Sequence, residues 1–582
     1  MKRIINVDER LFFLIFFTLA IFLRLIFLNV LPPALANDEA NVILNAQSLI
    51  NTGKNIPGVV TGVFGLHSGE TGGGIHSEFS SYFLALIYLI SGFSQTTARL
   101  PFVVAGVGVV VFLYLIADEL FGKKISKIVL VLAVVNPWMV QFSRSGYEAI
   151  IAAFFYLISI YLFLKNRGWK IFYSLPFLLF GFFSYFSAKT LLLPITFSFL
   201  VFALITKNKE NVKPVISLNI LTAVFLFLYF LALSKSPAGA RIAEFSPENF
   251  SNQVNYARTH SVDFPLAQFI ENKAVENLIY RIKATLGGAS LSFLFVDGVP
   301  ESSGHLQIPQ QGPMYLIDLF FVFVGFIFLA RRDLKKLTFL LLLVAASFLP
   351  NFFDIANSTY SMRPVLLIPM LILFSAYGIV SLLEIIKNKK FRVLAVLATA
   401  FIYLFFFTRF IFQYYYRLPI EENDTFFFQD KIATNYIRAL ERVEPSVKVV
   451  WVTPSPKFTF YRFIFFGDYY KNSFDIKKIN LRLASQDYSF GNVLFQSECP
   501  KEFSKDSLYL VDATMKCRLA DPSAIVANIN DAGVKYQLSR DPLCAGFGHR
   551  RYPLIKEFNL LRVESLSIKD FCDNYVISDQ LP

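Results

Sequence analysis

Charged residues are scarce in this sequence. Asp, Glu, Lys and Arg make up 17% of the 582 residues, whereas 55% are hydrophobic and 67 are Phe. Soluble chains carry about 25% charged residues, so this composition excludes an ordinary soluble protein and indicates a polytopic membrane protein. The net charge of +13 does not point to nucleic acid, because the Lys and Arg residues stand in short clusters between apolar segments.

Cysteine is absent before residue 499. All four cysteines, Cys499, Cys517, Cys544 and Cys572, lie near the C-terminus, and no two form a C-x-x-C pair. The spacing argues against a zinc site, and four free thiols are the other alternative. The clustering in a polar domain predicts two disulfides in an oxidising compartment, with the pairing left open. The sequence also lacks a small-residue cleavage site after its first apolar run, so we expect a retained anchor there.

Long apolar runs dominate the first 411 residues. Eleven are long enough to span a bilayer: 11–30, 99–119, 125–142, 147–164, 171–187, 190–206, 214–234, 314–330, 337–353, 364–386 and 391–411. Residues 78–93 form a shorter run, which is better suited to a helix in the membrane interface.

The basic clusters support this count of spans. Five of them follow the even-numbered spans, at 123–127, 165–170, 207–213, 331–336 and 387–392. With eleven spans and an interfacial 78–93, every cluster lies in the cytoplasm, as basic loops prefer. If 78–93 crossed the membrane, all of these clusters would lie outside.

This topology predicts a large outer face. It holds the loops 31–98 and 235–313 and everything after about residue 411, so we divide the chain into a membrane module (1–411) and a C-terminal domain (412–582). In that domain "KIATNYIRALERV" has a helical pattern, and "VKVVWVT" and "SLYLVDAT" read as strands, which predicts a small extracytoplasmic α/β domain.

Two adjacent acids, Asp38 and Glu39, open a moderately amphipathic run that ends at Thr52-Gly53. One interpretation is that Asn37 or Asp38 caps this helix. Capping needs a single short polar residue, however, and does not explain an acid pair that faces a basic outer rim. We therefore favour a functional role for the pair.

The cations of that rim occupy outer loops and the outer ends of spans, which positive charge normally avoids. They are Arg144, Lys189, Arg258 and Arg363. Each alone could be a snorkelling anchor, but together they suggest an anion site, with phosphate the commonest ligand. The loop "LHSGETGGGIHSE" (66–78) contains two His and two Glu, but their spacing matches no known metal site and predicts a glycine-rich loop.

At these residues the sequence resembles the type C (GT-C fold) membrane glycosyltransferases, above all family 39, the protein O-mannosyltransferases and lipid A aminoarabinose transferases. The resemblance rests on "DEANVILNAQSLINTG", "ARLPFVV", "LYLIADELFGKK" and "NPWMVQFSRSGYEA" and covers roughly residues 10–165. "SYFSAKTLLLP" and "SMRPVLLIP" extend it more weakly toward residue 386.

The resemblance implies a GT-C-like fold of about eleven transmembrane helices, with interfacial helices in the first outer loop. It makes Asp38, the first acid of the pair, the catalytic carboxylate, with Glu39 beside it. It also adds His76 to the phosphate-binding candidates, in the segment where many members have Lys-Pro or His-Pro and this chain has His76-Ser77-Glu78.

The implied reaction is transfer of a monosaccharide, a hexose or a pentose, from a polyprenyl-phosphate donor to a hydroxyl of a lipid, glycan or protein acceptor. A single base opposite the leaving phosphate implies inversion. We expect an active site on the outer face of the plasma membrane, with no cofactor and no nucleic-acid partner; no pattern indicates a divalent metal.

Three alternatives use the same residues differently. An oligosaccharide transferase would use a diphosphate-linked donor and a metal held by several acids, for example Asp354 with Asp38. A transporter would need ionisable groups within its spans, where Arg24 is the one clear case. A receptor-like C-terminal domain would not need eleven spans as its anchor.

Overall fold

The computed structural model describes residues 2–578 apart from 61, 63–64, 69–74, 235–249, 263, 299–305, 307, 309, 354–361, 422–423, 505, 516, 518–525, 532 and 546–556. The chain forms two compact units. Unit 1 consists of Met1–Ile26, Val63–Ser80 and Phe102–Tyr414, and unit 2 of Phe27–Gly62, Ser81–Pro101 and Tyr415–Pro582.

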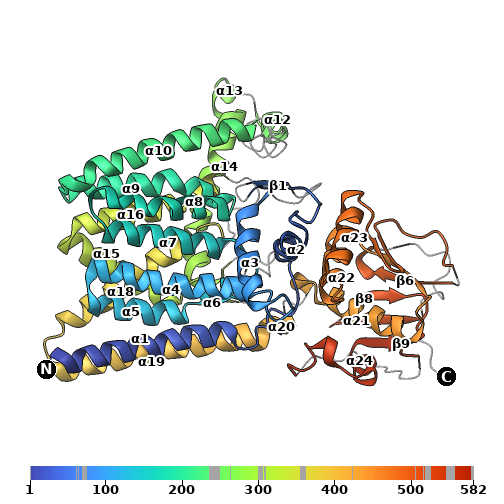
Figure 1. Cartoon of the computed structure of the whole chain (residues 1–582). Coiled ribbons are helices and arrows are strands. Elements are labelled where there is room, and N and C mark those ends of the chain that lie inside the picture. Colours follow the sequence, from blue (N-terminus) through green and yellow to red (C-terminus); the bar gives the residue numbers. More distant parts are fainter. Residues whose placement is uncertain are drawn as a thin grey trace. The chain divides into compact units, whose positions relative to one another are not determined.

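Unit 1 is a bundle of long apolar helices (Figure 1). Its helices are α1 (Lys2–Leu25), α4 (Leu100–Phe121), α5 (Lys123–Val135), α6 (Pro137–Phe142), α7 (Ala149–Lys165), α8 (Leu175–Ser184), α9 (Leu192–Ile205), α10 (Lys209–Ser234), α12 (Ser251–Thr259), α13 (Ala267–Ile270), α14 (Lys273–Gly288), α15 (Leu316–Arg332), α16 (Leu334–Ser347), α17 (Leu349–Phe353), α18 (Leu367–Ile385) and α19 (Lys389–Ile411). A short hairpin pairs β1 (Leu66–Ser68) with β2 (Ile75–Ser77) in antiparallel register.

Six helical segments in the described part of the chain are long and apolar enough to cross a membrane. They are Leu100–Phe121, Ser187–Ile205, Lys209–Ser234, Leu334–Phe353, Leu367–Ile385 and Lys389–Glu421. These segments confirm a helical, polytopic membrane fold, and each overlaps an expected span. The full number of eleven stays a prediction.

Residues 78–93 form helix α3 (Glu78–Ser91), as the sequence predicts. It has 14 residues, whereas about 20 are needed to span a bilayer. The helix is therefore confirmed, and its place in the membrane interface remains a prediction.

Helices α15 and α18 approach each other at two glycines. A Cβ on Gly325 would lie 2.0 Å from the carbonyl oxygen of Phe374, and one on Gly378 would lie 2.1 Å from that of Phe321. Because backbone atoms oppose both glycines, the helices can pack at this distance only without side chains there. Small residues at such crossings are typical of membrane helices, where close packing replaces the hydrophobic effect.

We predict that Gly378→Ala lowers the midpoint of thermal unfolding in detergent, because the methyl group must push the α15 backbone away; overpacking of this kind costs about 1–3 kcal/mol. Gly62→Ala is the matched control, since no atom lies within 4 Å of a Cβ at that position. Equal midpoints for the two variants would contradict the close helix crossing.

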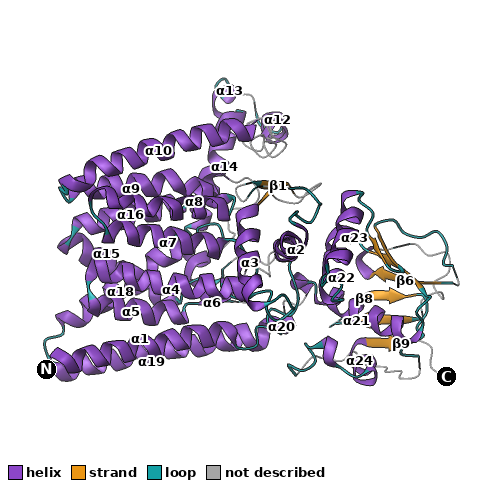
Figure 2. Ribbon diagram, in the orientation of Figure 1, coloured by secondary structure: helices purple, strands orange, loops and turns teal. Residues whose placement is uncertain are grey.

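Unit 2 contains a seven-stranded mixed sheet (Figure 2). The strands are β3 (Lys448–Val452), β4 (Ser489–Phe490), β5 (Val493–Gln496), β6 (Ser507–Asp512), β7 (Ala527–Asn530), β8 (Val534–Leu538) and β9 (Val576–Ser578), in the order β4-β5-β3-β6-β8-β7-β9. Strand β3 pairs in parallel with β5 and β6, and the remaining pairs are antiparallel. The helices are α2 (Asn37–Thr52), part of α3, α20 (Leu418–Glu421), α21 (Phe428–Val443), α22 (Pro456–Phe466), α23 (Ser473–Ala484) and α24 (Ile568–Tyr575).

The C-terminal α/β domain is confirmed in its elements. The three quoted patterns become α21, β3 and β6, and the apolar run of β3 is buried because the strand lies inside the sheet with strands on both sides. Disulfides join Cys499 to Cys517 and Cys544 to Cys572, which resolves the pairing that the sequence left open.

Two parts of the loop 31–98 belong to unit 2 with this domain, in the segments Phe27–Gly62 and Ser81–Pro101, whereas Val63–Ser80 belongs to unit 1. Helix α2 packs against α22 and α23, and the side chains of Ser48 and Asn480 are hydrogen-bonded at 3.1 Å. The amide of Gln95, in the segment after α3, donates to the carbonyl of Phe466 at 3.2 Å. The sequence predicts that residues 31–98 belong to the membrane module, because connectivity alone does not reveal contacts with residues some 400 positions later.

Candidate functional site

The acid pair lies in the first turn of α2. The helix begins at Asn37, and its N-cap is Ala36, which makes no side-chain capping bond. Neither Asn37 nor Asp38 therefore caps the helix, and the capping interpretation is wrong. The first turn still favours negative charge, because its free backbone N–H groups lie at the positive end of the helix dipole.

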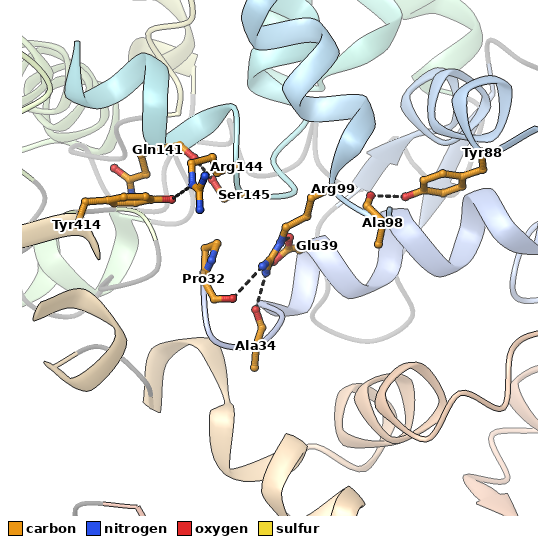
Figure 3. Close-up of polar contacts among 10 residues, drawn as sticks. All are labelled: Pro32, Ala34, Glu39, Tyr88, Ala98, Arg99, Gln141, Arg144, Ser145 and Tyr414. Carbon is orange, nitrogen blue, oxygen red and sulfur yellow. Dashed lines mark hydrogen bonds and ion pairs between the residues drawn. The ribbon is translucent and has the colours of Figure 1, made fainter. Parts of the chain in front are cut away.

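The two acids have different surroundings. Asp38 is half-buried, whereas Glu39 is fully buried. Arg99 binds Glu39 through two nitrogens: Nε donates to Oε1 at 2.6 Å and Nη2 to Oε2 at 3.0 Å. Arg99 is only 7% exposed, so the pair is a buried, bidentate ion pair (Figure 3). Such pairs are geometrically specific, because both groups are planar and forked.

The same guanidinium fixes the segment that enters α2. Nη1 of Arg99 donates to the carbonyl of Pro32 at 2.8 Å, and Nη2 donates to that of Ala34 at 2.6 Å (Figure 3). The residues 31–36 are buried throughout. Arg99 therefore holds the polypeptide on both sides of Asp38, from Pro32 to Glu39. Arg99 belongs to the segment "ARLPFVV", but the sequence predicts no role for it, since a pairing across 60 residues leaves no local signal.

Arg144 is a fully buried cation in unit 1, in the turn between α6 and α7. Its Nη1 donates to the carbonyls of Leu23 and Arg24 at 3.2 and 3.0 Å. Its Nε donates to the hydroxyl of Tyr414 at 3.3 Å, as Figure 3 shows. These bonds hold the guanidinium at the C-terminal end of α1. A buried arginine in this position is not a snorkelling anchor, because its head group does not reach water.

Lys189 is buried in a cage of aromatic rings, also in unit 1. Its Nζ donates to the carbonyl of Phe182 at 2.9 Å and lies 4.7–5.9 Å from the ring centroids of Phe182, Phe183, Phe186 and Tyr229. The faces of aromatic rings stabilise a cation that has left water.

The other cationic candidates differ in exposure. Arg363 is buried, whereas Arg258 is exposed on α12 and donates to the backbone carbonyl of Glu271. Arg258 is thus occupied by a local backbone bond, as a surface residue often is.

Part of the sequence-predicted set lies outside the described residues. His76 belongs to strand β2, but its side chain is not described, and neither is Asp354. Within the described ranges, no three His, Cys, Asp or Glu side chains gather so that they could hold a metal ion.

We predict that Glu39→Gln strongly destabilises the protein, because it leaves the buried Arg99 without its counter-charge; breaking a buried pair in this way costs about 3–5 kcal/mol. The measurement is the midpoint of thermal unfolding in detergent. Glu384→Gln is the matched control, because Glu384 forms exposed ion pairs with Lys124 and Arg332, and exposed pairs contribute about 0–1 kcal/mol. Equal effects of the two substitutions would show that Arg99 does not depend on Glu39.

Known proteins resemble the chain in part. Residues 76–232 match the family model described as dolichyl-phosphate-mannose-protein mannosyltransferase. Among curated proteins none matches.

Solved structures of low similarity were also found. The ArnT structure from Cupriavidus metallidurans bound to undecaprenyl phosphate is 10% identical, with 92% of this chain and 98% of that chain covered and a TM-score of 0.47. The oligosaccharyltransferase from Archaeoglobus fulgidus in complex with zinc and sulfate is 15% identical, with 87% and 68% covered and a TM-score of 0.45. Values of this size do not establish a common fold.

The matched region contains Arg99, Arg144 and Lys189, and it begins after Asp38. It includes the "ARLPFVV" and "NPWMVQFSRSGYEA" segments on which the sequence resemblance rests. The family match therefore confirms, for residues 76–232, the resemblance to the protein O-mannosyltransferase type of membrane glycosyltransferase.

Proposed function

We propose that this protein is an integral-membrane glycosyltransferase that moves a monosaccharide from a polyprenyl-phosphate donor to a hydroxyl of a lipid, glycan or protein. The match of residues 76–232 to a family whose description names a dolichyl-phosphate-mannose donor carries this proposal. The apolar helices support it, because the donor's long hydrocarbon tail requires an enzyme in the bilayer.

Asp38 is the proposed catalytic base. A polyprenyl phosphate is already a good leaving group, so the reaction requires removal of a proton from the acceptor hydroxyl as the sugar–phosphate bond breaks. Glu39 is less suited to this role, because both of its oxygens are bonded to Arg99. We assign Glu39 and Arg99 to positioning: they hold the first turn of α2 so that the half-buried Asp38 can meet a substrate.

The departing phosphate needs compensation of its negative charge. Arg144 is the proposed group, since its guanidinium keeps its positive charge and carries several N–H donors of the kind that bind phosphate. Lys189, Arg363, Arg258 and His76 are secondary candidates. Attack from the face opposite the phosphate inverts the anomeric carbon.

The proposed location of the site is the outer face of the plasma membrane. The basic clusters favour it, because they place the loop 31–98 and the C-terminal domain outside. The two disulfides of unit 2 are consistent with an oxidising compartment.

We predict that Asp38→Asn lowers turnover about 100-fold or more, because the amide has nearly the same size but cannot accept the proton. The measurement is release of polyprenyl phosphate from a panel of polyprenyl-phosphate sugars, with polyprenyl-phosphate mannose among them. Asp118→Asn, which alters an exposed ion pair with Lys123, is the control and should turn over normally. Normal turnover by Asp38→Asn would require another base.

We predict that Arg144→Lys raises the KM for the donor about 10-fold, because a lysine keeps the charge but lacks the planar set of N–H donors with which a guanidinium binds phosphate. The same release assay, run over a range of donor concentrations, measures this effect. Arg332→Lys, at an exposed ion pair with Glu384, serves as the matched control. An unchanged donor KM for Arg144→Lys would remove Arg144 from the phosphate site.

A further inference from the structure

A buried arginine of the C-terminal domain touches the residue that precedes Asp38. Arg462 lies on α22 and is 1% exposed, and its Nη1 donates to Oδ1 of Asn37 at 2.6 Å. The two residues are 425 positions apart in the sequence, and both belong to unit 2. This contact therefore joins the first turn of α2 directly to the C-terminal domain.

Arg462 is itself held by Asp430 on α21 and by Phe427, the residue that precedes α21. Its Nε donates to Oδ2 of Asp430 at 2.6 Å, and the other oxygen of that carboxylate accepts the hydroxyl of Tyr536 on β8. The guanidinium also lies 3.9 Å from the ring centroid of Phe427, which has a φ of +57°. Asp430, Arg462 and Tyr536 are all at most 1% exposed. With its charge paired and one face stacked on a ring, the guanidinium has a single fixed position.

Asn37 is available for this contact because it does not cap its helix. The N-cap is Ala36, so the Asn37 side chain is not committed to the backbone of α2. The residue after Asp38 is held as well, through the ion pair of Glu39 with Arg99. Both sequence neighbours of Asp38 are thus bound by buried arginines, one on each side.

The contact is not needed merely to dock α2. The far end of the helix is already joined to the domain by the Ser48–Asn480 hydrogen bond, and apolar packing against α22 and α23 accompanies it. Arg462 additionally fixes the position of the first turn of α2, which carries Asp38. Displacing a catalytic group by about 1 Å can reduce the rate about 100-fold.

We propose that Arg462 is a positioning residue for the catalytic base, and that the C-terminal domain serves as the scaffold that sets the position of Asp38 through Asn37. This inference rests on the proposed role of Asp38. It gives the domain a function within the reaction, through the path from Tyr536 and Asp430 to Arg462 and then to Asn37.

The principal test is Asn37→Ala, which removes the acceptor but leaves Arg462 paired with Asp430, so that no buried charge is exposed. We expect kcat to fall about 10-fold to 100-fold, with the donor KM and the unfolding midpoint nearly unchanged. Asn37→Asp should restore most of kcat, because its carboxylate oxygen can accept the same bond from Arg462. The assay is release of polyprenyl phosphate from the full-length protein.

Ser48→Ala is the matched control, since it removes a hydrogen bond between α2 and the same domain, far along the helix from Asp38. It should keep normal kcat. An equal fall in kcat for Ser48→Ala and Asn37→Ala would mean that general docking of α2 is at work, and the specific role of Arg462 would be wrong. The same conclusion follows if Asn37→Ala turns over normally.

Arg462→Lys is a second test that leaves Asn37 in place. Its shorter ammonium cannot bond Asp430 and Asn37 in the same geometry, so kcat should fall as in Asn37→Ala, and the double variant should show no further fall. Independent, multiplied losses would contradict the proposal. Asp38→Asn, measured in parallel, separates two failures: if it is active, the proposed role of Asp38 as the base is wrong, and if it is inactive while Asn37→Ala is normal, only the positioning role is wrong.

Discussion

The structure of the candidate site depends on the buried ion pair between Glu39 and Arg99. Both groups are removed from water, so neither can stay charged and stable without the other. Because Arg99 also binds the carbonyls of Pro32 and Ala34, satisfying the glutamate fixes the path of the chain into α2. The adjacent Asp38 gains a defined position while its own side chain stays partly accessible. Glu39 thus fixes the local structure, and Asp38 remains accessible to a substrate.

The helical membrane fold and the strands of the C-terminal domain could be predicted from the sequence, because apolar length and periodicity are local properties. The acid pair could also be singled out, since its position after a span was visible. Arg99 and Arg462 were missed as partners, because Glu39 and Asn37 are 60 and 425 residues away from them. Capping by Asn37 or Asp38 fits the local sequence, but both residues lie within the first turn of the helix and not at its N-cap position.

The division of the chain shows a similar limit. A boundary near residue 411 follows from the end of the last apolar run, and the compact units separate at Tyr414 and Tyr415. Yet unit 2 also takes in Phe27–Gly62 and Ser81–Pro101, which come before most of the membrane helices. A buried arginine on α22 and polar pairs along α2 and α23 hold this early segment, and no composition shift in the sequence marks it.

The disulfide between Cys544 and Cys572 is connected through hydrogen-bonded side chains to the element that holds Arg462. The backbone N–H of Cys544 donates to Asp541, which also accepts the hydroxyl of Tyr436 on α21, and α21 carries the Asp430 that holds Arg462. A disulfide that closes a loop of this size lowers the conformational entropy of the unfolded chain and so stabilises the folded state by about 3 kcal/mol. Under the proposed outward orientation, α2 would therefore receive its final support only after export and oxidation.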